Sequence, residues 1–170
     1  MNRKSPSGPE PVVLRALRAG DIPALIQLAQ RTWRTHYASI ISAEQIEYML
    51  GVQFAEGELL NQIQAQTPAY TVAERSGELI GFITRRQKPP GWFIDKFYVA
   101  TEAQGLGVGT ALLRHISADL APGSELRLHV NRGNRRAIDF YRRRGFDIEA
   151  SIDLPYGPFT LNDYVMRKRL

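Results

Sequence analysis

The stretch that decides the fold is Gln104-Gly105-Leu106-Gly107-Val108-Gly109, which follows an apolar segment ending at Val99 and precedes a segment with helical periodicity. Three glycines at alternate positions remove side chains from a loop, so that its backbone N–H groups can converge on an anion. The helix that begins at about Gly107 adds the positive end of its dipole at the same place. A strand, a glycine-rich turn and a helix in this order predict a binding site for a pyrophosphate.

Three known glycine-rich motifs can be compared with this stretch. A P-loop requires a lysine after its last glycine, and no lysine follows any glycine in this chain. A dinucleotide fingerprint, Gly-x-Gly-x-x-Gly, fits Gly105 and Gly107 but meets Thr110 at its third glycine, and residues 100–103 separate the loop from the strand. A third code, Gln/Arg-x-x-Gly-x-Gly/Ala, matches the stretch from Gln104 to Gly109. For this motif taken alone, a plain glycine turn before a core helix is the alternative.

A second motif follows towards the C-terminus. Residues 126–130 alternate apolar side chains and predict a short strand. Asn134 then stands where a helix N-cap is expected, and Gly145 where the helix should stop. The buried stripe of this helix is predicted to comprise Ala137, Ile138, Phe140 and Tyr141.

The two motifs, in this order and at this spacing, resemble the GNAT superfamily of acetyl-CoA-dependent N-acetyltransferases. The family's second motif is similar to Asn134-Arg-Arg-Ala-Ile-Asp-Phe-Tyr141 followed by Gly145-Phe146, and a last strand at 163–166 also fits. The resemblance covers residues 12–170. It implies an α+β fold, with a central, mostly antiparallel twisted sheet of six to seven strands, one parallel splayed pair and about four flanking helices.

The remaining elements are predicted from periodicity and turn signals. Asp21 is expected to cap a first helix, and Ser42 with Gln45 forms a capping-box signature for a second. The other predicted elements are a strand at 12–17, a helix at 58–66, a hairpin of strands 69–75 and 79–86, and one continuous strand at 92–99.

Length and composition limit the number of domains and the classes of protein that are compatible with this sequence. A chain of 170 residues with 44% hydrophobic content supports one core, which predicts a single domain. The resemblance implies that this is an N-acetyltransferase domain at 12–170, behind a disordered tail at 1–11. There is no cysteine, so disulfides and cysteine nucleophiles are excluded. The apolar runs are too short to span a bilayer, and the N-terminus lacks a signal-peptide core. We therefore expect a cytoplasmic protein that does not bind membranes.

The net charge of +5 is concentrated around one predicted helix. Its arginines repeat at a seven-residue spacing, which places them on a solvated face, and no interleaved aromatic residues support base stacking. We therefore predict no nucleic-acid partner. Such a face would instead help to attract the anionic 3′-phosphate of CoA.

The resemblance implies where the acetyl donor binds. The pantetheine arm would pair with the unpartnered backbone of the strand at Phe97, Tyr98 and Val99, and a backbone N–H there would polarise the thioester carbonyl. Asn134 would contact the cofactor arm, although a plain N-cap is its alternative role. The pyrophosphate would be held by Gln104, Gly105, Leu106, Gly107, Val108, Gly109 and Thr110.

Two residues are candidates for proton transfer. Tyr141 occupies the position of the family's usual general acid, beside the cofactor, where a phenol can protonate the departing CoA thiolate. A buried core tyrosine is the alternative. Asp95 is an unusual acidic residue within a predicted strand and is the candidate general base, a solvent-facing or salt-bridged aspartate being the alternative. No metal is expected.

The acceptor is expected against the first helices, where Trp33, His36, Tyr37 and Glu44 lie. These residues are loosely similar to the bacterial polyamine-acetyltransferase-like subgroup, and aromatic and acidic side chains suit a cationic amine. A small amine or polyamine is therefore predicted. Alternatives are a protein N-terminus or lysine as acceptor, or a non-catalytic acyl-CoA sensor of the same fold. A monomer or a homodimer is expected.

Overall fold

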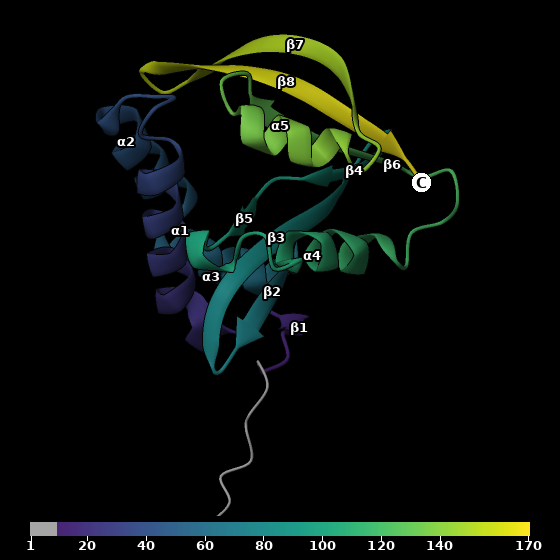
Figure 1. The fold of residues 1–170 in the computed structure, drawn as a ribbon. Coiled ribbons are helices and arrows are strands. Elements are labelled where there is room, and N and C mark those ends of the chain that lie inside the picture. The colour runs from purple at the N-terminus through teal and green to yellow at the C-terminus, as the bar shows by residue number, and fades with distance from the viewer. Residues whose placement is uncertain (1–9) are drawn as a thin grey trace, which may run out of the picture.

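The computed structural model describes residues 10–170. Eight strands form one sheet in the order β1-β2-β3-β4-β6-β8-β7, with β5 paired to β3 off this path (Figure 1). The strands are β1 (Val13–Ala16), β2 (Ala69–Arg75), β3 (Glu78–Lys88), β4 (Gly91–Ile94), β5 (Phe97–Val99), β6 (Glu125–Asn131), β7 (Asp147–Tyr156) and β8 (Phe159–Arg169). The α-helices are α1 (Ile22–His36), α2 (Ala43–Gln53), α3 (Glu56–Ala65), α4 (Val108–Ser117) and α5 (Arg135–Arg142). The predicted tail at 1–11 lies almost wholly outside the described residues.

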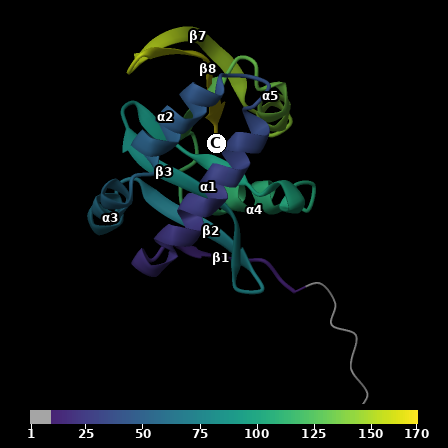
Figure 2. The same ribbon diagram turned by 90° about the vertical axis from the view of Figure 1, so that its left-hand side faces the viewer.

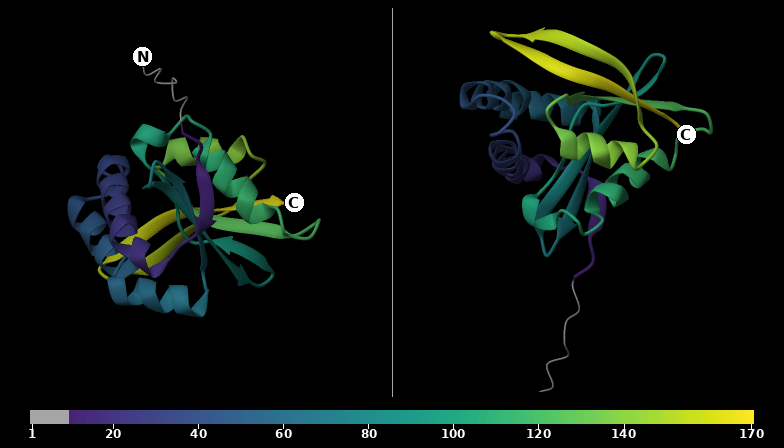
Figure 3. Two further views of the ribbon diagram at one scale, coloured as in Figure 1. Left: turned by 90° about the horizontal axis from the view of Figure 1, so that it is seen from below. Right: turned by 45° about the horizontal axis from the view of Figure 1, so that its top comes forward.

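Helices cover both faces of the sheet. Phe82 of β3 packs against Phe54, which follows α2, whereas the neighbouring Gly81 faces Val108 and Leu112 of α4. Alternate residues of one strand thus contact helices on opposite sides. Figure 2 shows α1 and α2 in front of the sheet, and the left panel of Figure 3 shows α4 and α5 on the other side. The predicted α+β fold with a mostly antiparallel sheet is confirmed.

The strand predicted as continuous over 92–99 is broken, and this corrects the prediction. β4 ends at Ile94 and pairs with β6 in parallel, whereas β5 begins at Phe97 and, among residues 10–170, pairs with β3 alone. In the break, the Lys96 N–H donates to Thr84 Oγ1 (2.9 Å), and the Thr84 N–H donates to the Lys96 carbonyl (2.8 Å). The chain therefore changes partners here: β4 is paired with β6, and β5 is not.

The hairpin of β7 and β8 extends the sheet beyond the predicted number of strands. Only a strand at 163–166 was expected, and β8 is much longer. β7 was not predicted, because its residues are mostly exposed and show no apolar alternation. The turn places Gly157 at φ +56°, which favours glycine.

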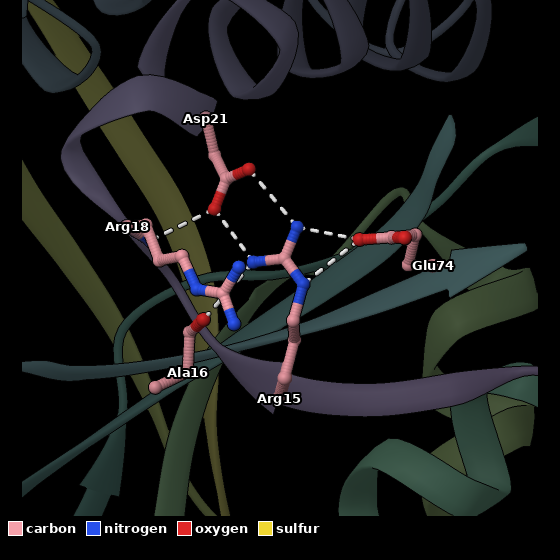
Figure 4. Close-up of polar contacts among 5 residues, drawn as sticks. All are labelled: Arg15, Ala16, Arg18, Asp21 and Glu74. Carbon is pink, nitrogen blue, oxygen red and sulfur yellow. Dashed lines mark hydrogen bonds and ion pairs between the residues drawn. The ribbon is translucent and has the colours of Figure 1, made fainter. Parts of the chain in front are cut away.

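The start of α1 differs from the simple cap predicted at Asp21. Its carboxylate accepts hydrogen bonds from the Arg18 N–H (2.8 Å) and from the Arg15 guanidinium (2.6 and 3.0 Å) (Figure 4). Arg15 also binds Glu74 on β2. Asp21 therefore ties β1 to the turn before α1. By contrast, Ser42 caps α2 as predicted, since its Oγ accepts from the Gln45 N–H (3.1 Å).

Candidate active site

One edge of β5 carries free backbone groups. Thr84 N–H donates to the Lys96 carbonyl (2.8 Å), and Ala100 N–H donates to β3 (2.9 Å), so positions 96, 98 and 100 face β3. The N–H and C=O groups of Phe97 and Val99 therefore point the other way. Within residues 10–170 no strand pairs with β5 on that side. This edge can accept an extended ligand as a strand would be accepted.

The glycine loop lies between β5 and α4. Gly105 and Gly107 have φ values of +78° and +80°, and no heavy atom lies within 4 Å of the place that a Cβ would take at either. The first helical bond runs from the Ala111 N–H to the Gly107 carbonyl (2.9 Å). The N–H groups of residues 108–110 have no acceptor within the described chain, as expected for a helix N-terminus. The loop thus offers several N–H donors on an open face.

Gly109 has a different role from the other two glycines. It lies inside the first turn of α4, and a Cβ there would stand 3.2 Å from the Phe140 ring of α5. The absence of a side chain lets α4 approach α5 closely. Leu106, by contrast, is exposed at the outside of the loop.

The Gln104 side chain turns inward, away from the open face of the loop. Its Nε2 donates to the Val99 carbonyl (3.0 Å) and lies 2.8 Å from His36 Nε2. Because an amide nitrogen only donates, His36 accepts at Nε2 and carries its proton on Nδ1. Burial and the charge of Arg136 also lower the pKa of His36. Gln104 thus links the loop to β5 and α1, and both the hydrogen bond and the lowered pKa favour the neutral form of His36.

Arg144 brings a positive charge to the start of α4. Its guanidinium donates to Thr110 Oγ1 and to the Phe140 carbonyl (3.0 Å), and it lies 3.5 Å from the centroid of the Phe140 ring. Its Nε is buried without a partner. Burial, reinforced by Arg143, lowers the pKa of Arg144. The seven-residue spacing of the arginines predicts only a solvated face in this region and gives no sign of this contact.

Tyr141 lies on the buried side of α5 and faces β5. Its ring is 6.1 Å from the Phe97 ring and 5.5 Å from the Phe146 ring. Burial raises the pKa of Tyr141, so the phenol stays protonated. The start of the same helix is capped by Asn134, whose Oδ1 accepts from the Ala137 N–H (3.2 Å).

The aromatic residues predicted for the acceptor pack together at the end of α1. Trp33 is only 2% exposed and lies 4.7 Å from the Tyr37 ring and 5.7 Å from the Tyr98 ring. Burial raises the pKa of Tyr37, and the polar side chains of Asn134 and Tyr98 oppose that rise. Trp33 therefore lies in the core, whereas Tyr37 lies between α1 and the start of α5.

Asp95 forms a salt bridge. It lies in the break between β4 and β5, and both of its oxygens accept from Arg86 Nε (2.9 and 2.8 Å). This is the salt-bridged alternative that the sequence left open. A carboxylate held in this way has a structural partner before any amine arrives.

A second carboxylate, Asp163 of β8, was missed as a site residue. Its side chain is only 8% exposed, and burial raises its pKa to about 6. Its charge adds to the rise in the pKa of Tyr37, which places the two residues in one electrostatic environment. An acidic residue within a predicted strand was the available signal, as it was for Asp95.

Residues 10–170 contain no cluster of three or more histidine and acidic residues that could hold a metal ion. In the same part of the chain, no helix is long and apolar enough to cross a membrane.

The comparisons with known proteins identify the class of protein and its family. A model of the acetyltransferase (GNAT) family matches residues 23–146, so the chain belongs to this family. The relatives include a spermidine N(1)-acetyltransferase of Thermoplasma acidophilum, which is 26% identical over 164 residues that cover 93% of this chain and 97% of the relative.

Solved structures agree with this assignment. The PaiA N-acetyltransferase of Thermoplasma acidophilum, solved in complex with coenzyme A, superposes with a TM-score of 0.80 at 26% identity. The match covers 94% of this chain and 99% of that one. A peptidyl-lysine N-acetyltransferase of Salmonella typhimurium, YjaB, is 29% identical over 91 residues, 54% of this chain and 58% of the relative.

Proposed function

We propose that this protein transfers the acetyl group of acetyl-CoA to a small cationic amine, with a polyamine such as spermidine as the acceptor class. The observation that carries the proposal is the free edge of β5 beside the glycine loop. Together they offer backbone donors and acceptors along a line that ends at the start of a helix. An extended thioester with a diphosphate at its far end matches that order of groups.

The residues at the loop fit the anionic part of the donor. The open faces of Gly105 and Gly107 let the backbone approach a phosphate, and the helix dipole and Arg144 add positive charge. The residues proposed to hold the pyrophosphate are Gln104, Gly105, Leu106, Gly107, Val108, Gly109 and Thr110. Gln104 contributes through its backbone, because its side chain is bound to Val99 and His36.

The pantetheine arm is proposed to pair with the N–H and C=O groups of Phe97 and with the N–H of Val99, which point away from β3. The Val99 carbonyl already accepts a hydrogen bond from Gln104. Tyr98 points its backbone towards β3 and packs its ring against Trp33, so its contribution is structural. Asn134 contacts the cofactor arm from the start of α5. A free N–H on β5 polarises the thioester carbonyl, which stabilises negative charge on the oxygen during amine attack.

Tyr141 is proposed as the general acid. Burial keeps its phenol protonated, and its ring lies against Phe97, one of the residues proposed to bind the pantetheine arm. The phenol can therefore donate a proton to the thiolate as the C–S bond breaks. Tyr141→Phe should lower kcat at least about 10²-fold and leave the affinity for acetyl-CoA nearly unchanged. Equal kcat in this variant would remove Tyr141 from its role.

Two contacts support a small acceptor over a peptide. Before α2, Ile40 lies 3.0 Å from the position of a Cβ on Gly133 in the turn after β6. On α2, Tyr48 packs onto Gly157 of the β7–β8 turn and lies 5.5 Å from the Phe159 ring. The α1–α2 segment is therefore bound to the C-terminal half at two places, and we take these contacts to favour a small acceptor.

Release of CoA from acetyl-CoA tests this function when it is measured with a panel of acceptors. Spermidine is expected to give a higher kcat/KM than a monoamine of similar length, and peptides with free N-termini or lysines should give little release. Preference for a peptide would assign the protein to the protein acetyltransferases. Binding of acetyl-CoA without turnover on any amine would favour the sensor alternative.

A further inference from the structure

Asp163 is the buried carboxylate that the donor site does not use. It is 8% exposed and is the single aspartate or glutamate among the buried residues of the described chain. Its register partners are Asn131 on β6 and Ile152 on β7, so the hairpin holds it in the middle of three strands. Within residues 10–170 its side chain makes no hydrogen bond and no ion pair.

The charged and titratable neighbours of Asp163 leave this carboxylate without a partner. Tyr37, which follows α1, lies within the electrostatic reach of Asp163, and burial raises the pKa of its phenol so that it stays neutral. Arg132 faces it from the turn after β6, but the Arg132 guanidinium is bound to Asp153 (2.5 Å) and Ser151 (2.7 Å). Arg132 therefore opposes the burial effect on Asp163 without neutralising it.

A buried carboxylate without a cation is unfavourable, because the charged form has lost its hydration. The same carboxylate becomes favourable when a ligand supplies a positive charge. The two contacts described above, Ile40 on Gly133 and Tyr48 on Gly157, tie the α1–α2 segment to the two turns that flank this part of the sheet in sequence. Gly133 follows Asn131, the β6 partner of Asp163, by two residues. Figures 1 and 2 show α2 beside the β7–β8 hairpin that carries Asp163.

The other candidate bases already have partners. Asp95 is bound by Arg86 through both of its oxygens, and His36 accepts a hydrogen bond from Gln104 at Nε2. A base must have a free lone pair within reach of the proton that it removes. Asp163 meets that requirement with both carboxylate oxygens.

We propose that Asp163 binds the ammonium group of the acceptor and removes its proton before acetyl transfer. This inference rests on the proposed function, whose acceptor is a cationic amine. Asp163 takes one proton from the ammonium, and the neutral nitrogen forms the C–N bond with the thioester carbon. The C–S bond then breaks, and Tyr141 protonates the thiolate. The second nitrogen proton restores the Tyr141 phenol, and Asp163 releases its proton to water, so the reaction liberates one proton.

The raised pKa of Asp163, about 6, suits this task. An alkylammonium has a pKa near ~10, so the increase from 3.8 narrows the gap between the two groups by roughly two units. A base with a pKa closer to neutral accepts a proton more readily and still releases it at pH 7.

The test compares Asp163→Asn with wild-type protein across a pH series of kcat/KM for spermidine. Asp147→Asn, at the exposed start of the same hairpin, is the matched control. Wild type and the control should both gain activity as the pH rises through about 6, because Asp163 must be ionised to act. Asp163→Asn should lose about 10²-fold or more at pH 7 and lack this acid limb. The difference in kcat/KM between Asp163→Asn and wild type should become smaller as the pH approaches the pKa of the amine. At that pH much of the acceptor is already unprotonated and needs no base.

Acetyl-CoA affinity and thermal unfolding, measured on the same samples, separate catalysis from folding. Unchanged acetyl-CoA affinity with lost turnover supports the proposal. An acid limb that persists in Asp163→Asn would assign the titration to another group and overturn it. Failure of wild type to acetylate any amine would instead contradict the proposed function, so the two failures are distinguishable.

Discussion

At the scale of single residues, the buried carboxylate of Asp163 lowers the stability of the folded chain at neutral pH. Its folded-state pKa of about 6 lies above the ordinary value of 3.8, so the folded chain binds the proton more tightly than the unfolded chain. Stability is therefore lost as the pH rises from about 4 to about 6, and the loss is complete at neutral pH. The shift of about two units corresponds to roughly 3 kcal/mol.

Asp163→Asn should accordingly be more stable than wild type at pH 8, by up to about 3 kcal/mol, because the neutral amide has no charge to desolvate. The difference should vanish near pH 4, where Asp163 is protonated. Urea unfolding at the two pH values measures it, with Asp147→Asn as control. A variant that is less stable at pH 8 would show that Asp163 has a stabilising partner after all.

A substitution at Gly107 tests whether the glycine loop binds the pyrophosphate of acetyl-CoA. Its φ of +80° disfavours any residue with a Cβ by roughly 1–2 kcal/mol, and a β-branched side chain would also cover the open face of the loop. Gly107→Val should therefore weaken acetyl-CoA binding by an order of magnitude or more. Gly51→Ala, within α2, is the control that should bind normally. Calorimetric affinities decide the matter, and an unchanged value for Gly107→Val would refute the assignment of the loop.

At the scale of elements, the proposed binding site for the amine depends on the contact between α2 and the β7–β8 turn. A side chain at Gly157 would overlap the Tyr48 phenol, and φ there is +56°. Gly157→Ala should push the hairpin away from α2 and raise the KM for spermidine several-fold, while the KM for acetyl-CoA stays the same. Steady-state kinetics with each substrate varied in turn makes the distinction. A rise in both values would indicate a general loss of structure instead.

The elements also show which parts of the fold can be predicted from sequence. The helix starts at Ser42 and Asn134 follow from side chains that bond to nearby backbone, so local pattern suffices for them. The break before Phe97 depends on the Thr84 hydroxyl of another strand, and no local signal reveals it. β7 lacks an apolar pattern because its side chains are mostly exposed, so periodicity has nothing to detect.

At the scale of the whole molecule, the same limit applies to the candidate site. The residues of the glycine loop are contiguous, and the sequence predicts them together. The environments of Asp95 and Asp163 arise from packing: Arg86 reaches Asp95 from β3, whereas Arg132 is turned from Asp163 towards Asp153. Their sequence contexts are similar, an acidic residue within a predicted strand. Only the folded chain separates a bound carboxylate from a free one.

The whole molecule is proposed to place an acetyl donor on the edge of β5 and a small amine beside β8. Mass spectrometry of spermidine incubated with acetyl-CoA and the wild-type protein tests that claim most directly. Spermidine carrying one acetyl group is expected, formed in equal amount to free CoA. Free CoA without acetylated spermidine, or no reaction although acetyl-CoA binds, would contradict it.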